Sequence, residues 1–169
     1  MASPFDPYGG PKKGPMAPLQ LLPMALAPWI AGKATIVGMG REIRVLIVDE
    51  HELARRELAA QLCRSDAFAL VAQAANEEEA LRLAQEIEPQ VVLLDPKMRR
   101  TDGIALCQRL RQATQPPQVL VLTSFWDAHE QMLCYRSGAR RYLLKEIDVG
   151  PLLTLIYASV GENLTRNPA

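Results

Sequence analysis

One short stretch limits the possible folds of this chain more than any other. Residues 91–94 are all valine or leucine, and the next residue is Asp95. A strand that is apolar along its whole length, rather than at every second residue, indicates burial on both faces, as in a parallel sheet. Parallel strands need long crossover connections, usually helices. The stretch therefore favours an α/β fold with helices on both sides of a sheet.

The surrounding sequence alternates between strand-like and helix-like segments. We predict strands at residues 43–48, 68–75, 91–95, 119–123 and 141–144, and helices at 52–64, 76–88, 102–112, 127–137 and 149–161. Asn76, with Glu79 three residues later, is typical of a helix start, and Pro89 is expected to end that helix. Five strands that alternate with five helices predict one parallel sheet covered on both faces.

Polar side chains follow the predicted strands at the edge where parallel α/β proteins carry their functional groups. Asp49 and Glu50 follow the first strand, and Asp95 follows the third. Thr123 ends the fourth strand, and Lys145 follows the fifth. Each residue alone also has a purely structural explanation, as a turn or cap, a β-former or a surface lysine. Their joint placement at one edge predicts a functional site.

The residue types in this group suit phosphoryl transfer. Clustered carboxylates repel one another, and Mg²⁺ is the natural compensating cation because it binds carboxylates together with phosphate oxygens. Asp95 would be the nucleophile that forms an acyl phosphate. Lys145 would pair with the phosphoryl oxygens, and Thr123 would donate a hydrogen bond to them. The sequence has no glycine-rich phosphate loop, which disfavours nucleotide binding of the P-loop or Rossmann type.

Composition restricts the partners and the compartment. The 169 residues include 19 basic and 19 acidic side chains, so the formal net charge is zero. This balance does not indicate a nucleic-acid surface over the whole domain. Cys63, Cys107 and Cys134 are too widely spaced for a metal cluster. We expect buried free thiols in a reducing cytosol.

Residues 1–40 differ from the rest of the chain, with prolines at positions 4, 7, 11, 15, 18, 23 and 28. Prolines at this density prevent a regular helix or central strand, so we expect a Pro/Gly-rich tail that is disordered or docks on a partner. Lys12 and Lys13 before the apolar residues 19–30 also resemble a signal peptide, although prolines interrupt it and it is too short to span a bilayer. Met39 offers an alternative start of the chain.

From about residue 43 to 161 the chain resembles a response-regulator receiver domain of bacterial two-component systems, most like the NarL/FixJ type. The stretches that carry the resemblance are residues 45–52, 75–81, 91–95, 102–103, 119–125 and 137–145. The resemblance implies a flavodoxin-like (CheY-like) fold with a five-stranded parallel sheet in the order 2-1-3-4-5. It also implies a receiver domain at residues 41–162, followed by a short tail at 163–169.

The resemblance gives each site residue a role. It implies the phosphoacceptor Asp95, the Mg²⁺ ligands Asp49, Glu50, Asp95 and the backbone carbonyl of Lys97, the phosphoryl ligands Thr123 and Lys145, and the switch pair Thr123 and Tyr142. The sequence departs from the family at four places: Glu50 replaces the usual second aspartate, Pro96 directly follows the acceptor, Arg99 replaces a proline after Met98, and Glu146 replaces the proline that often follows the lysine. We therefore expect an altered loop after Asp95, with the required groups retained.

The implied function is a phosphorelay switch rather than an enzyme. A histidine kinase or phosphotransfer protein would phosphorylate Asp95 in the cytoplasm, and protein contacts would change in response, without direct binding to nucleic acid or membrane. The chain ends shortly after the last helix, so we expect a stand-alone receiver or the shortened receiver part of a DNA-binding regulator. One alternative is a pseudo-receiver that is never phosphorylated in practice. Another is a flavodoxin-like enzyme or flavin carrier, which the acidic cluster disfavours because a flavin phosphate would meet like charge.

The last predicted helix has an unusually apolar surface. No charged residue occurs between Val149 and Val160. Three-and-four spacing directs one set of residues to the sheet (Leu152, Leu155, Ile156 and Ser159) and leaves another beside it (Leu153, Tyr157 and Val160). The helix either has a wide buried side or offers a contact surface. Our hypothesis is a homodimer through this helix.

Overall fold

The computed structural model describes residues 43–66 and 68–166, with side chains up to residue 161. The strands are β1 (Ile43–Val48), β2 (Phe68–Ala74), β3 (Val91–Leu94), β4 (Lys97–Met98), β5 (Thr101–Asp102), β6 (Gln118–Thr123) and β7 (Arg141–Leu144). The helices are α2 (Glu52–Leu62), α3 (Glu77–Ile87), α4 (Gly103–Leu110), α5 (Ala128–Arg136) and α6 (Val149–Arg166). The predicted tail at residues 1–40 and the possible start at Met39 lie outside the described residues.

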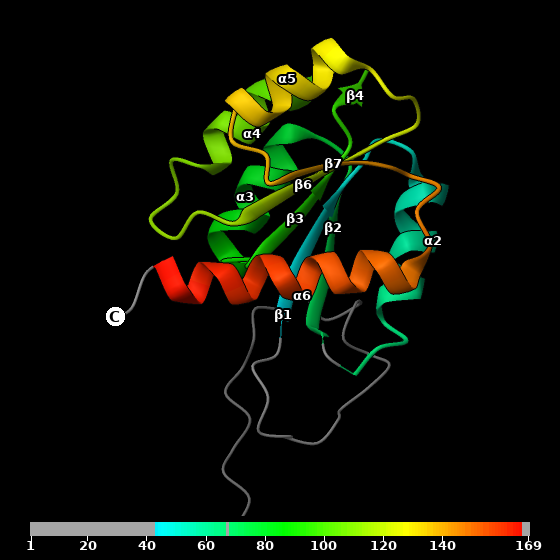
Figure 1. Ribbon diagram of the computed structural model, residues 1–169, viewed down its shortest axis with the longest axis vertical. Coiled ribbons are helices and arrows are strands. Elements are labelled where there is room, and N and C mark those ends of the chain that lie inside the picture. Colours follow the sequence, from blue (N-terminus) through cyan, green and yellow to red (C-terminus); the bar gives the residue numbers. More distant parts are fainter. Residues whose placement is uncertain (1–42, 67, 167–169) are drawn as a thin grey trace, which may run out of the picture. The chain divides into compact units, whose positions relative to one another are not determined.

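The main sheet has five parallel strands in the order β2-β1-β3-β6-β7. This is the predicted order, because β4 and β5 form a separate small sheet and do not join the main one. Helices α2 and α6 cover one face, and α3, α4 and α5 cover the other (Figure 1). All carboxyl ends of the main strands therefore meet at one edge.

The centre of the sheet is β3, the apolar strand that directly precedes Asp95. All residues of β3 are at most 1% exposed, and β1 and β6 pair with it on either side. On the α2–α6 face, Ile47, Leu93 and Leu122 pack in one core cluster with Leu62 and Ile156. The predicted burial of β3 on both faces is confirmed, and this burial fixes the backbone from which Asp95 emerges.

Helix caps explain where three of the helices begin. The side chain of Asn76 accepts a bond from Glu79 N (2.9 Å), and Glu79 Oε2 accepts one from Ala75 N (2.8 Å). This arrangement confirms the predicted start of α3. Asp102 and Asp127 cap α4 and α5 in the same way, each accepting from two backbone N–H groups of the first turn.

The loop after Asp95 contains structure that the sequence did not predict in detail. β4 and β5 pair antiparallel, with Lys97 opposite Asp102 and Met98 opposite Thr101. Met98 and Thr101 are buried, whereas Lys97 is exposed. The loop after Asp95, which the family departures led us to expect would be altered, forms a short hairpin that leads directly into α4.

Helix α6 buries a slightly different set of residues from the one that its spacing predicted. Leu152, Ile156 and Ser159 are buried as expected, but Leu155 is only partly buried, and Val160, expected beside the buried stripe, is buried instead. Tyr157 is 41% exposed and its ring stacks on Phe68, with 6.2 Å between ring centroids. The helix continues to Arg166, beyond the predicted end near residue 161. Within residues 43–66 and 68–166, no helix is long and apolar enough to cross a bilayer.

The cysteines differ in exposure. Cys107 and Cys134 are buried, and burial raises the pKa of the Cys107 thiol to about 11 and that of the Cys134 thiol to about 12. Cys63 is exposed at the end of α2, so the expectation of burial is wrong for this residue. The position follows the last buried residue of α2, Leu62, where the helix ends and its surface opens to solvent.

Candidate functional site

Two aspartates and a lysine meet at the carboxyl edge of the main sheet. The backbone of each is held by a bond that extends the sheet: Asp49 N to Ala74 O (3.1 Å), Asp95 N to Val48 O (2.9 Å) and Lys145 N to Thr123 O (2.8 Å). Asp49 is 6% exposed and Asp95 is 5% exposed. The topology thus brings together three residues that are far apart in sequence.

The ammonium group of Lys145 bridges the two carboxylates. Its Nζ atom lies 2.6 Å from Asp49 Oδ2 and 2.7 Å from Asp95 Oδ2. Burial opposes the charged form of Lys145, but the hydrogen bonds to Asp49 and Asp95 and their negative charges outweigh it, so the pKa of Lys145 is raised above its ordinary value. The lysine therefore stays protonated and offsets the repulsion between the aspartates.

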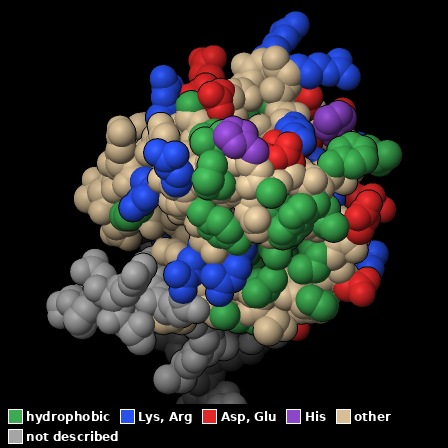
Figure 2. Space-filling model, turned by 45° about the horizontal axis from the view of Figure 1, so that its top comes forward, with side chains coloured by type: hydrophobic (Ala, Val, Ile, Leu, Met, Phe, Trp, Pro, Cys, Tyr) green, Lys and Arg blue, Asp and Glu red, His purple; other side chains and the backbone are tan. Residues whose placement is uncertain are grey.

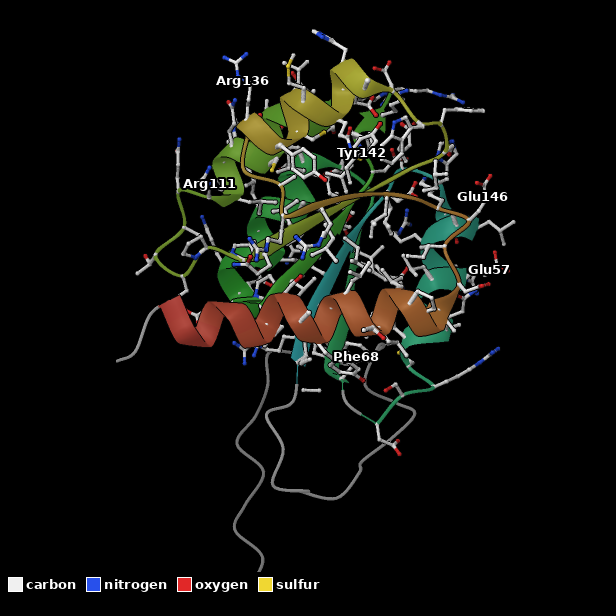
Figure 3. The ribbon with its side chains drawn as sticks, viewed as in Figure 1. Glu57, Phe68, Arg111, Arg136, Tyr142 and Glu146 are labelled. Atoms are coloured by element: carbon white, nitrogen blue, oxygen red, sulfur yellow. The ribbon has the colours of Figure 1, made fainter. Side chains whose placement is uncertain are left out.

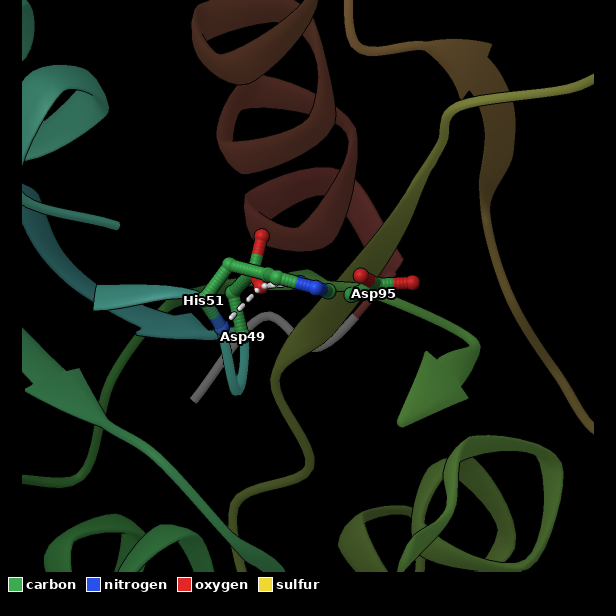
Figure 4. Close-up of side chains that lie close together, drawn as sticks. All are labelled: Asp49, His51 and Asp95. Atoms are coloured by element: carbon green, nitrogen blue, oxygen red, sulfur yellow. Dashed lines mark hydrogen bonds and ion pairs between the residues drawn. The ribbon is translucent and has the colours of Figure 1, made fainter. Parts of the chain in front are cut away.

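The remaining carboxylate oxygens have partners from the following residues. Asp49 Oδ1 accepts from His51 N (2.8 Å) and lies 3.2 Å from His51 Nδ1, and Asp95 Oδ1 accepts from Lys97 N (2.8 Å). One ligand atom each from Asp49, His51 and Asp95 lies within 4.8 Å of the others, a grouping compatible with a metal ion (Figure 4). His51 was not predicted as a site residue from the sequence, although it directly follows the two acids.

Glu50, the second predicted acid, points to a different partner. Its carboxylate accepts from Arg99 N (2.9 Å) and lies 3.7 Å from Arg99 Nε. Arg99 belongs to the turn between β4 and β5, so Glu50 joins the end of β1 to this hairpin. The metal-ligand roles of Asp49, Glu50, Asp95 and the Lys97 carbonyl stay predictions.

The predicted switch residues lie next to the acidic site and share a partner on α5. Thr123 is fully buried, and its hydroxyl lies 3.1 Å from Phe125 O and 3.4 Å from Glu130 Oε1. Tyr142 is 3% exposed and donates to Glu130 Oε1 at 2.6 Å. Figure 3 shows Tyr142 beneath α5. Glu130 was not among the residues singled out from the sequence.

Exposed aromatic side chains lie close to this switch. Trp126 packs edge-on against Tyr142, with 5.2 Å between ring centroids, and is itself 56% exposed. Phe125 is 73% exposed. Figure 2 brings the carboxyl edge of the sheet toward the viewer and shows hydrophobic side chains gathered beside acidic and basic ones. A change in the position of Tyr142 would therefore change an accessible surface.

A cavity of about 210 Å³ opens between the acidic site, α2 and the start of α6. Asp49, Asp95 and Lys145 line one part of it, while Leu58 and Ile147 line another. Two buried carboxylates beside open space match the oxygen ligands that Mg²⁺ prefers, and the histidine nitrogen suits it less. The residues present therefore fit a Mg²⁺ ion with a small anion beside it.

The ionisation of Tyr142 gives a first test of this geometry. Burial and the hydrogen bond to Glu130 raise the pKa of Tyr142 to about 12. Because the pKa is raised in the folded state, the associated stability is complete below the unfolded value of about 10 and is lost as pH rises toward the folded value. Spectrophotometric titration should show a tyrosine that ionises near pH 12 and is missing from Tyr142→Phe. If Tyr142→Phe instead removes a component near about pH 10, the buried hydrogen bond is wrong.

The sheet order and the acid–lysine edge together define the CheY-like class of parallel α/β domains. Residues 45–157 match the family model of the response regulator receiver domain. The fold also matches a CheY-like receiver domain from Methanospirillum hungatei JF-1, with a TM-score of 0.67 at 21% identity over 75% of this chain and 99% of that one. This second likeness concerns the fold alone.

Similar proteins extend the match beyond the fold. The transcriptional regulatory protein LiaR of Bacillus subtilis is 35% identical over 69% of this chain and 56% of its own length. A two-component response regulator of the LuxR family from Aurantimonas sp. SI85-9A1 has a TM-score of 0.66 and 27% identity, over 72% of this chain and 86% of that one. The chain belongs to the response regulator receiver domain family of two-component signalling proteins. It spans about half the length of the curated relatives it matches.

Proposed function

We propose that this chain is a phosphorylatable switch, in which Asp95 accepts a phosphoryl group from a histidine kinase or phosphotransfer protein. The observation that carries this proposal is the bridge from Lys145 Nζ to both Asp49 and Asp95. A half-buried lysine between two carboxylates supplies a donor that can turn from a carboxylate to a phosphoryl oxygen.

Residues of the site can supply a group for each step of the transfer. A carboxylate oxygen of Asp95 bonds to phosphorus while the bond from phosphorus to the donor's imidazole nitrogen breaks, and that nitrogen keeps the electron pair. The Lys145 ammonium follows the transferred group, and the Thr123 hydroxyl turns toward it. Tyr142 then moves into the space that Thr123 leaves, which is a shift between two arrangements with different contacts.

Asp49 and Asp95, with Glu50 and the carbonyl of Lys97, would hold Mg²⁺ at this site. When bound, Mg²⁺ supplies charge neutralisation between the incoming phosphoryl oxygens and the carboxylates. Glu50 Oε2 accepts from Arg99 N, while Oε1 is 3.7 Å from Arg99 Nε, so the carboxylate keeps lone pairs with which it could serve as a ligand.

The test of this function is incubation with acetyl phosphate and Mg²⁺, followed by intact mass spectrometry. We expect one phosphoryl adduct, and we expect a chelator to prevent its formation. The pseudo-receiver alternative expects an unmodified mass under both conditions. A flavin carrier would likewise stay unmodified but would retain a yellow chromophore, so the same sample distinguishes the three classes.

The output of the switch is proposed to be a change in protein contacts, with a second copy of the chain as one partner. Exposed apolar side chains on α6 support this, because Val149 is 37% exposed and Tyr157 is 41% exposed. The relatives are named as transcriptional regulators and are about twice as long as the matched part. A receiver that controls a DNA-binding domain elsewhere is the second candidate, and it needs the same phosphorylation site.

Sedimentation velocity tests the dimer. We expect self-association that beryllofluoride, a phosphoryl mimic, strengthens, and that Val149→Glu and Tyr157→Glu weaken because each places a charge in an apolar contact. Val149→Glu is the cleaner variant, since Tyr157 also stacks on Phe68 within the chain. A parent protein that stays monomeric at high concentration with and without the mimic would eliminate the dimer. A dimer that neither variant affects must use another surface.

A further inference from the structure

Glu130 occupies a position that the proposed phosphorylation chemistry does not explain. It is the third residue of α5, and the cap residue Asp127 fixes its backbone by accepting from Glu130 N at 3.0 Å. An Asp followed three residues later by Glu is the pattern of a capping box, in which the Glu side chain bonds back to the cap. Here the carboxylate is directed instead toward the interior, to Tyr142 and Thr123.

Donor groups from three separate segments lie close to the Glu130 carboxylate. Tyr142 Oη donates from β7 at 2.6 Å. The Thr123 hydroxyl at the end of β6 lies 3.4 Å from Glu130 Oε1 and 3.1 Å from Phe125 O, so its one hydrogen is shared between these two acceptors. Lys97 Nζ in β4 lies 3.4 Å from the other oxygen, Glu130 Oε2. The side chain of Glu130 is only 13% exposed, so it depends on these donors to compensate for lost hydration.

Two of these donors also flank the acceptor site. Lys97 is two residues after Asp95, and its backbone N–H already bonds to Asp95 Oδ1. Thr123 ends the strand adjacent to β3 and is the residue expected to turn toward a phosphoryl group. A phosphorylated Asp95 and the Glu130 carboxylate are therefore two anions that compete for the Thr123 hydroxyl and the Lys97 ammonium group.

We propose that Glu130 is the positioning residue through which the phosphoryl group on Asp95 acts on Tyr142 and helix α5. Phosphorylation draws Thr123 and Lys97 away from Glu130. The carboxylate is then left in a mostly buried position with fewer donors, which is costly. Glu130, together with Tyr142 and the first turn of α5, moves to a new arrangement. This inference rests on the proposed phosphorylation of Asp95.

Because of this competition, Glu130→Gln should change the binding of a phosphoryl mimic and the response of Tyr142 in opposite directions. Gln keeps the size of the side chain and an oxygen that can accept from Tyr142, but it removes the charge that competes for Thr123 and Lys97. A phosphoryl mimic should therefore bind more easily, while its effect on Tyr142 should shrink. A residue that only supports the fold would weaken both when replaced.

Two readouts separate binding from response. Fluorine NMR of bound beryllofluoride in the presence of Mg²⁺ measures occupancy of the Asp95 site. Fluorescence of Trp126, which packs on Tyr142, measures the response, and Trp29→Phe in every variant removes the other tryptophan of the chain. Glu78→Gln is the matched control, because it makes the same change of charge at an exposed position on α3.

For Glu130→Gln we expect half-saturation at a beryllofluoride concentration lower by about fivefold or more, the low end of typical coupling between sites. We also expect a smaller change in Trp126 fluorescence at saturation. Glu78→Gln should match the parent in both. In a Thr123→Ala background the effect of Glu130→Gln on half-saturation should be smaller, because one of the two contested donors is already gone.

Three results would overturn the inference. An unchanged half-saturation concentration in Glu130→Gln would show that Glu130 does not compete with the phosphoryl mimic. A full Trp126 fluorescence response in that variant would show that Glu130 does not couple the site to Tyr142. If Glu130→Gln shifts half-saturation by the same amount in the Thr123→Ala background, Glu130 does not act through Thr123. A parent protein that does not bind beryllofluoride at all would instead overturn the proposed phosphorylation, and the competition with it, so the two failures are distinct.

Discussion

Replacement of Asp95 by Asn is expected to abolish phosphoryl labelling of this protein completely. An amide oxygen is a far weaker nucleophile than a carboxylate, and Asp95 is the carboxylate at the carboxyl end of the central strand β3. Intact mass after incubation with acetyl phosphate and Mg²⁺ should show only the unmodified Asp95→Asn chain. Asp148→Asn, which changes an exposed aspartate just before α6, should label as the parent does.

The fold of Asp95→Asn should survive the change. Asn is nearly the same size as Asp, its side-chain oxygen can still accept from Lys97 N, and Lys145 keeps its bond to Asp49. We expect an unchanged circular dichroism spectrum, so that lost labelling reports chemistry rather than unfolding. Labelling of Asp95→Asn at the level of the parent would show that the acceptor is another residue.

Gly103→Ala is expected to give the largest loss of stability among the single changes considered. A Cβ atom on Gly103 would lie 2.7 Å from Pro96 Cα, and 2.9 Å from both Asp95 O and Pro96 O. These are backbone atoms, so relief requires the loop after the acceptor to move. Overpacking of this kind costs about 1–3 kcal/mol, and we expect the upper part of that range because no flexible side chain can yield. Denaturant unfolding measures the loss.

Gly150→Ala provides the matched comparison. Gly150 also lies in the first turn of a helix, α6, but a Cβ atom there would have no atom within 4 Å. Alanine should therefore stabilise the protein slightly, by about 0.4–1 kcal/mol, because it reduces the freedom of the unfolded chain. If both variants unfold at the denaturant concentration of the parent, the close approach of Gly103 to the Asp95 loop is incorrect. Gly103→Ala should also label more slowly than Gly150→Ala, since the clash displaces the acceptor backbone.

The sheet and the centre of the site were predictable because they depend on patterns with a physical period. An apolar run such as β3 can only be buried on both faces, and parallel strands all end at one edge. Asp49, Asp95 and Lys145 follow from these two facts without knowledge of any long-range contact. The cap at Asn76 is equally local, since its side chain bonds to the turn that follows it.

The sequence could not predict which of several possible partners a polar side chain contacts. Glu50 carries the right charge for a metal ligand, but its contact with Arg99 depends on the path of a hairpin that no periodic pattern marks. Glu130 fits a capping box by its spacing from Asp127, and only the packing of β7 against α5 brings the Tyr142 hydroxyl within 2.6 Å of it. Side-chain direction at such positions is decided by tertiary contacts, to which single-sequence patterns are blind.

The contrast between β3 and α5 has a consequence for amide hydrogen exchange. β3 is paired on both sides and its residues are at most 1% exposed, whereas among the residues of α5 only Cys134 is buried. Amides of β3 should therefore exchange only when the whole domain opens, while α5 should exchange through local fraying at a much lower free energy. The proposed acceptor thus follows a strand that is expected to exchange slowly, and the proposed responding helix is expected to exchange fast. A rearrangement of α5 should then not require the rest of the domain to open.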